Sequence, residues 1–134
     1  AATYAPLASP TFTGTASAKD EDANTYNIGW RDCPQNAKTA NYQLLISDRG
    51  KQILMSGTSL TLTVPANGTV AFPLGTTIMV VNTDATALTI AITTDTMTLA
   101  NSTTTGSRTI ARNGMATLTK IGATNWLIAG TGVT

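Results

Sequence analysis

The sequence contains no histidine and only one cysteine, Cys33. Without histidine the chain lacks the usual general base near neutral pH, the base of Ser-His-Asp and Cys-His catalysis, and the commonest metal ligand. A single cysteine excludes an internal disulfide and fits a protein made in a reducing compartment. Arg31 is the only candidate activator near Cys33, which we interpret as an inert thiol in a turn. We therefore expect no catalytic residue, no metal and no cofactor.

Charge is also scarce, since Asp, Glu, Lys and Arg make up 11% of the chain, against about 25% in an ordinary globular protein. The net charge is +1 and the basic residues are scattered, so the sequence predicts no nucleic-acid binding. No apolar run reaches the roughly 18 residues of a membrane-spanning helix, which predicts no membrane insertion. The carboxylates of the chain's body lie in predicted turns, where Asp commonly accepts backbone hydrogen bonds, although two of them could form a glycosidase pair. They are Asp32, Asp48, Asp84 and Asp95.

Threonine is the most frequent residue, and Thr, Val and Ile dominate the apolar segments. Because β-branched side chains pack well on a pleated surface, the composition predicts an all-β fold. Short candidate strands recur at the spacing of about 8–12 residues that is typical of a sandwich or barrel. We therefore predict an antiparallel β-sandwich or barrel-like domain. The expected strands are 26–31, 42–46, 51–55, 59–64, 76–82, 88–92, 97–99, 109–111, 116–121 and 126–129.

Particular patterns predict the core. Residues 59–64 alternate between polar and apolar side chains, as a strand with one wet face does, whereas 76–82 contains a continuous apolar run that predicts burial on both faces. The dipeptide Asn113-Gly114 is a strong hairpin signal. We expect Phe72 and Trp126 to be buried beside strong core strands. Leu118 is also assigned to the core, and Met115 and Ile121 are candidates for it.

The N-terminal segment differs from the rest of the chain. Residues 1–22 contain Pro6 and Pro10 with widely spaced apolar side chains, and they end in the charged run Lys19-Asp20-Glu21-Asp22. Prolines favour extended backbone, and so few apolar residues cannot form a core. We predict an extended N-terminal arm at 1–22 and a β module at 23–134. The charged run is interpreted as a solvated boundary, with a metal site as the alternative.

Several segments resemble bacteriophage proteins. The stretch from Ala5 to Thr15, APLASPTFTGT, looks like a segment that recurs in tail fibres and tailspikes of tailed bacteriophages. Most of the remaining chain resembles a module of the same fibre proteins. That second resemblance is carried by 31–36, 42–44, 47–51, 65–67, 70–76, 89–91, 95–97, 105–109, Lys120 and 126–132.

This resemblance implies a homotrimeric tail-fibre component of the virion, assembled in the host cytoplasm, that attaches to the bacterial surface. Its partners would be copies of itself, other tail proteins, and a surface polysaccharide or outer-membrane protein. Candidate receptor contacts are Trp30, Arg31 and Tyr42, together with the polar loop 101–106. Leu7 and Phe12 in the arm are candidates for the trimer interface. Two alternatives remain open: a purely structural collar, connector or head-decorating module without receptor contact, and a polysaccharide depolymerase.

Overall fold

The computed structural model describes the backbone of residues 17–19 and 25–27 and all of residues 32–134. The chain divides into two units, 1–32 and 33–134. In the first unit, β1 (Ser17–Lys19) and β2 (Thr25–Asn27) pair antiparallel. The predicted boundary between residues 22 and 23 falls outside the described residues, as do the arm residues Leu7 and Phe12. The boundary and the arm's role stay predictions.

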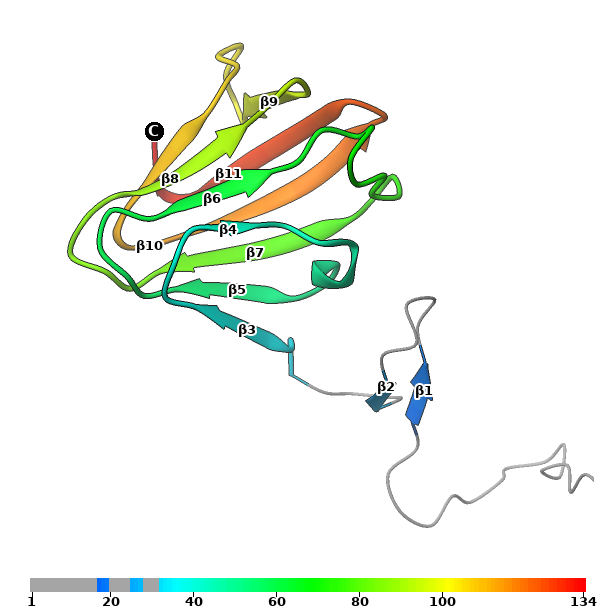
Figure 1. Cartoon of the computed structure of the whole chain (residues 1–134). Helices are drawn as coiled ribbons and strands as arrows, with labels where there is room; N and C mark the ends of the chain where they lie inside the picture. The colour runs from blue at the N-terminus through cyan, green and yellow to red at the C-terminus, as the bar shows by residue number, and fades with distance from the viewer. Residues whose placement is uncertain (1–16, 20–24, 28–31) are drawn as a thin grey trace, which may run out of the picture. The chain divides into compact units, whose positions relative to one another are not determined.

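The second unit is a nearly closed, barrel-shaped β-sheet (Figure 1), which confirms the all-β, barrel-like prediction. It contains one short 3-10 helix, η1 (Ile46–Asp48). Its strands are β3 (Gln35–Lys38), β4 (Tyr42–Gln43), β5 (Gln52–Met55), β6 (Thr61–Val64), β7 (Thr77–Asn82), β8 (Leu88–Ile92), β9 (Thr96–Leu99), β10 (Arg108–Gly122) and β11 (Asn125–Val133).

Two walls of parallel strands make up most of the barrel. Strands β3, β5 and β7 form one wall, and β4, β6 and β8 form the other. The chain crosses from one wall to the other between consecutive strands, so neighbours within a wall are two steps apart in sequence and run in the same direction. The expected antiparallel pairing is therefore wrong for these walls. Within the barrel it holds where β10 meets β7, β8 and β11.

Strand β10 joins the two walls. One of its edges pairs with β8 over residues 108–110 and with β7 over 115–119, while β11 follows the other edge. The register shifts between Ile110 and Met115, and Asn113 has a φ of 56°. Asn113-Gly114 is thus an irregularity within one long strand, and the predicted hairpin at this dipeptide is wrong. The tight hairpin lies instead between β10 and β11, at residues 123–124.

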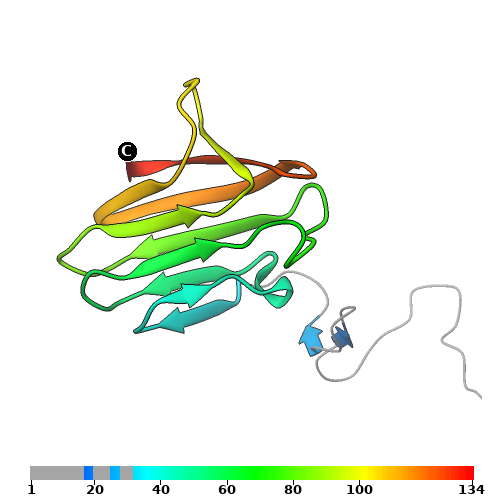
Figure 2. The same cartoon turned by 45° about the horizontal axis from the view of Figure 1, so that its top comes forward.

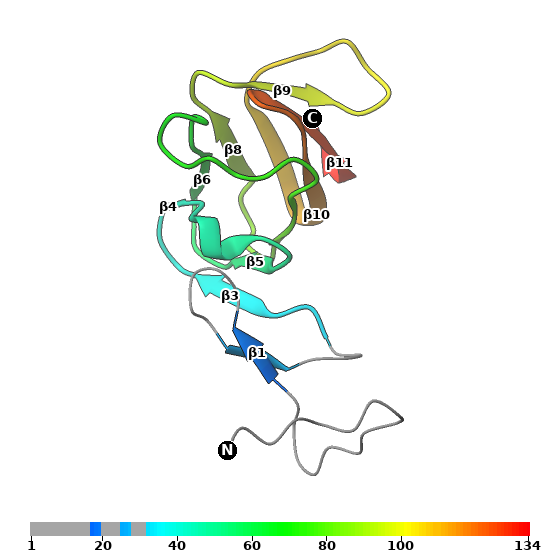
Figure 3. The same cartoon turned by 90° about the vertical axis from the view of Figure 1, so that its right-hand side faces the viewer.

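The core lies between the walls (Figure 3). The alternation in β6 is confirmed, since Leu62 and Val64 are fully buried and Thr61 and Thr63 are not. Phe72 and Trp126 are 3% and 0% exposed, as predicted. The other fully buried apolar side chains come from both walls, from the residue after β4, and from β9, β10 and β11: Leu44, Ile53, Met55, Ile78, Val80, Leu88, Ile90, Met97, Ile110, Leu118 and Ile128.

Candidate functional site

Residues 33–134 cover only one of the two faces of strand β7. Ile78, Val80 and Asn82 point into the core, whereas Met79 and Val81 are half-buried on the outer side. The prediction that 76–82 is buried on both faces is therefore wrong for this unit. Apolar side chains on an outward sheet face are the kind of surface that another protein surface covers. This strand thus contributes apolar residues to a surface that the unit itself leaves open.

The surface extends across five strands, and we call it the apolar face. Ala37, Leu54, Val81 and Met115 form one cross-strand row, because each pairs in register with the next. Met115 is 44% exposed, so its expected place in the core is wrong. The apolar face comprises the outward residues Ala37, Leu54, Met79, Val81, Met115, Leu127 and Ala129, interleaved with Gln35, Gln52, Thr77, Thr117 and Thr119.

No Asp, Glu, Lys or Arg stands among these outward positions of the described strands. Monomeric proteins usually spread charge over their surface, while the centres of protein interfaces are depleted in charge and enriched in Met and aromatic side chains. The neighbouring residues Leu74 and Ile121 are 68% and 56% exposed. The expected burial of Ile121 is thus wrong as well. The apolar face has the composition of a protein–protein contact surface.

The loop between β9 and β10 projects away from the barrel (Figure 2). Its residues 101–105 are exposed and polar, and the Ser102 Oγ and Thr104 Oγ1 atoms lie 2.8 Å apart. Arg108 follows the loop and is 9% exposed. Its Nη1 donates to the Ser107 carbonyl at 3.0 Å, and within the described part of the chain its Nε and Nη2 have no hydrogen-bond partner. Because both nitrogens are buried, they are not accessible to a ligand at the surface of the loop.

The predicted receptor contacts are not brought together by the described structure. Trp30 and Arg31 lie outside the described residues. The Tyr42 hydroxyl donates to Asp48 Oδ2 at 2.9 Å, and Lys38 Nζ lies 4.2 Å from the centroid of the Tyr42 ring. Burial, the hydrogen bond to Asp48 and the Asp48 charge raise the pKa of Tyr42 to about 12. These contacts give Tyr42 a structural role, and its role as a receptor contact stays a prediction.

Asp48 is fully buried and joins three segments. Its Oδ1 accepts a hydrogen bond from Asn36 Nδ2 at 2.8 Å, and its Oδ2 also accepts one from the Leu45 backbone N–H at 2.8 Å. This confirms the expected backbone hydrogen bonding for Asp48, and Asp84 likewise accepts from the Thr86 N–H at 2.9 Å. A carboxylate held by several donors in the interior is a structural anchor.

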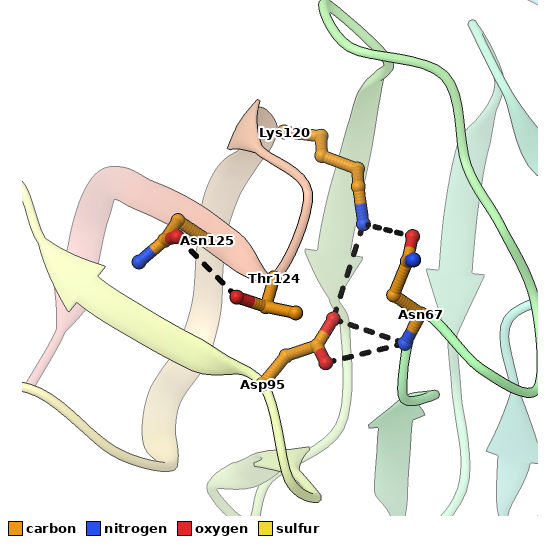
Figure 4. A network of polar contacts seen from close by, with 5 residues as sticks. All are labelled: Asn67, Asp95, Lys120, Thr124 and Asn125. Carbon is orange, nitrogen blue, oxygen red and sulfur yellow. Dashed lines mark hydrogen bonds and ion pairs between the residues drawn. The ribbon is translucent and has the colours of Figure 1, made fainter.

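A second buried polar group surrounds Lys120 near the end of β10 (Figure 4). Its Nζ donates to Asn67 Oδ1 at 3.1 Å and lies 3.9 Å from Asp95 Oδ2. The Lys120 and Asp95 side chains are 1% and 3% exposed. Both Asp95 oxygens accept from the Asn67 backbone N–H, at 3.2 and 3.1 Å. Three residues from three separate segments thus meet in one water-poor site.

Aromatic rings cover one side of this group. Lys120 pairs in register with Trp126, and its Nζ lies 5.0 Å from the centroid of the indole ring. Phe72 packs edge-on against Trp126, with the ring centroids 5.4 Å apart at 81°. Burial lowers the pKa of the Lys120 ammonium, and the Asp95 charge opposes that shift. Sequence reasoning missed this site, although the alternation after Leu118 places Lys120 on the inward side.

Within 32–134, no group of three His, Cys, Asp or Glu side chains is placed to hold a metal ion. No helix in the described residues is long and apolar enough to cross a bilayer. The chain matches no protein-family model and no curated protein.

Proposed function

We propose that the chain is a subunit of a homotrimeric bacteriophage tail fibre that attaches to the bacterial surface. The apolar face is the observation that supports assembly into a trimer. Residues 33–134 bury the inner side of this sheet and leave the apolar face uncovered. A strand such as β7, with four consecutive apolar residues (Ile78–Val81), is suited to a sheet that is covered on both sides. A second copy of the chain supplies that cover in the proposed assembly.

The threefold symmetry and the virion location rest on the resemblance of the APLASPTFTGT segment to phage fibres. The fold supports this assignment in a general way, because a charge-poor sheet with an uncharged outer face suits permanent packing against identical copies. Such an interface buries surface that is more apolar than the surface of a typical soluble monomer.

For receptor contact, the loop 100–107 is the best-placed described segment. It projects from the barrel, and its residues 101–105 are exposed and polar. Polar hydroxyl and amide groups on a projecting loop suit hydrogen bonding to a polar surface such as a polysaccharide. In this proposal the loop contacts the bacterial surface, and the apolar face forms the contact between subunits.

Attachment to bacteria and assembly into a trimer can be tested separately. Fluorescently labelled chain is incubated with a panel of bacterial strains, and we expect saturable adsorption to at least one strain that unlabelled chain competes away. Replacing Ser102, Thr103 and Thr104 by Ala should weaken that adsorption, whereas Thr61→Ala and Thr63→Ala on the β6 wall serve as the control. A trimer that adsorbs to no strain would contradict the receptor role and support a purely structural virion module.

A further inference from the structure

We propose that Lys120 and Asn67 form an intramolecular amide (isopeptide) bond, in which the lysine Nζ replaces the side-chain nitrogen of Asn67, and that Asp95 promotes the reaction. The amine and the carboxamide are already in contact, since Nζ lies 3.1 Å from Asn67 Oδ1. The carboxylate of Asp95 lies 3.9 Å from the same Nζ. Nucleophile, electrophile and proton acceptor therefore meet at one place (Figure 4).

Burial at this site favours the reactive, neutral form of the lysine. A protonated lysine is not a nucleophile, and burial lowers the pKa of Lys120, which increases the share of neutral amine. The side chains of Lys120 and Asp95 are almost completely buried. Asp95 is the proposed acceptor of the ammonium proton, because its Oδ2 lies 3.9 Å from Nζ.

Asn67 is held in place for the attack by its own backbone. Its N–H donates to both oxygens of Asp95, and the turn around it is closed by hydrogen bonds from the Thr69 and Val70 N–H groups to the Ala66 carbonyl. Lys120 is fixed on the other side, because its N–H donates to Thr76 and its carbonyl accepts from Gly75. Holding two reacting groups in contact replaces a bimolecular encounter by a unimolecular step, which is a large kinetic advantage.

The reaction balances without any external reagent. Asp95 accepts a proton from the Lys120 ammonium, and the neutral Nζ attacks Asn67 Cγ to form a new C–N bond. Asp95 carries this proton, because its Oδ2 lies 3.9 Å from Nζ. The bond between Cγ and Nδ2 then breaks. The leaving nitrogen takes two of the three protons of the original ammonium, one of them by way of Asp95, and the third stays on Nζ as the amide N–H. The products are a secondary amide and an ammonium ion, and Asp95 returns to its carboxylate form.

Trp126 and Phe72 have a protective role in this proposal. Their edge-to-face pair stands against the lysine, and Trp126 is fully buried. Bulk water would hydrate the ammonium and so disfavour its deprotonation. The bond would join the β6–β7 connection to β10 across 53 residues of sequence. It would therefore fasten a connection between the two walls to β10, the strand that pairs with both of them.

The test is peptide mapping of the folded full chain by mass spectrometry after incubation at neutral pH. Trypsin does not cleave after an acylated lysine. We therefore expect residues 113–134 to remain uncleaved at Lys120 and to be joined to peptide 52–108, at a mass one ammonia below the sum of the two. Free peptides 113–120 and 121–134 as the main products, with unmodified 52–108, would overturn the proposal.

Loss of ammonia alone is insufficient, because Asn67-Gly68 can also lose ammonia by closing a succinimide on its own backbone. Lys120→Arg separates the two reactions: the isopeptide disappears in this variant, whereas a succinimide persists. An ammonia loss in the unsubstituted chain without the joined peptides 52–108 and 113–134, which then persists in Lys120→Arg, would overturn the proposal. Asp95→Asn should slow cross-linking at least tenfold if Asp95 moves the proton, and unchanged cross-linking would contradict its role. The peptide map of the unsubstituted chain decides the bond's existence even if a variant fails to fold.

Discussion

The Tyr42 hydroxyl donates a 2.9 Å hydrogen bond to the buried carboxylate of Asp48. Tyr42 begins β4, and Asn36, which bonds the other oxygen of the same carboxylate, lies in β3. These two strands are the free ends of the strand order β3-β5-β7-β10-β8-β6-β4. Side-chain hydrogen bonds through Asp48 therefore connect the barrel where its backbone ladder stops.

Because of this connection, the free energy of unfolding should decrease at alkaline pH. The pKa of Tyr42 is raised from its ordinary 10.0 to about 12 in the folded chain, so the folded state holds the phenolic proton more tightly than the unfolded state does. The contribution of Tyr42 is complete below about pH 10 and is lost as the pH rises toward 12. The free energy of unfolding should fall in this window by up to about 1.4 kcal/mol per pH unit.

Urea unfolding at several pH values measures this dependence, with Tyr42→Phe as the control. The variant should be less stable by ~1 kcal/mol near pH 8, because one hydrogen bond is lost, and its stability should decline less steeply between pH 10 and 12. Parallel declines in the two proteins would show that other groups cause the effect.

Asn82 is expected to be among the most sensitive polar positions. It is 1% exposed, and its Nδ2 donates to the carbonyls of Thr86, Ile110 and Ala111 at 2.9, 3.1 and 3.2 Å. Asn82→Leu would leave these acceptors without that donor, which should destabilise the fold by ~2–4 kcal/mol. Thermal or urea unfolding measures the change, and Gln43→Leu at an exposed position is the control. If Asn82→Leu lost less stability than the control variant, the role of Asn82 would be contradicted.

Gly130 marks a close approach between β10 and β11. A Cβ at Gly130 would stand 2.0 Å from the Met115 carbonyl oxygen and 2.6 Å from the Ala116 Cα. Gly130→Ala should therefore separate the strands locally and cost ~1–3 kcal/mol of stability. Gly68→Ala is the matched control, because a Cβ there meets nothing within 4 Å. Equal unfolding midpoints for the two variants would contradict the predicted clash.

Local patterns were enough to predict much of the fold. Alternation identified β6 and its inward residues, and the positions of Phe72 and Trp126 beside strong strands predicted their burial. Strand β3 was missed, because Gln35-Asn36-Ala37-Lys38 is polar and lies at the end of the sheet. An edge strand needs few apolar residues, so its sequence gives little hydrophobic signal.

The parallel walls and the buried polar groups could not be predicted in the same way. Strand direction depends on which strands become neighbours, and the alternation of 59–64 is the same in either pairing. Asn113-Gly114 fits a turn locally, but the pairing of β10 with β7 and β8 keeps the strand continuous there. Asn67, Asp95 and Lys120 come from three distant segments, and only the folded topology brings them together.

In the proposed trimer, copies of the chain cover the apolar face. Met115→Glu or Val81→Glu would place a carboxylate on that face, where burial of an unpaired charge is costly. Each substitution should dissociate the assembly while leaving the β-sheet signal in circular dichroism unchanged. Thr63→Glu, on the outward side of the β6 wall, is the matched control and should leave the assembly intact.

Native mass spectrometry of residues 1–134 at micromolar concentration tests this claim most directly. We predict a species of three 13.8 kDa chains for the unsubstituted protein and for Thr63→Glu. We predict smaller species for Met115→Glu and Val81→Glu. A monomer for the unsubstituted protein, or a trimer that neither glutamate on the apolar face weakens, would contradict the account.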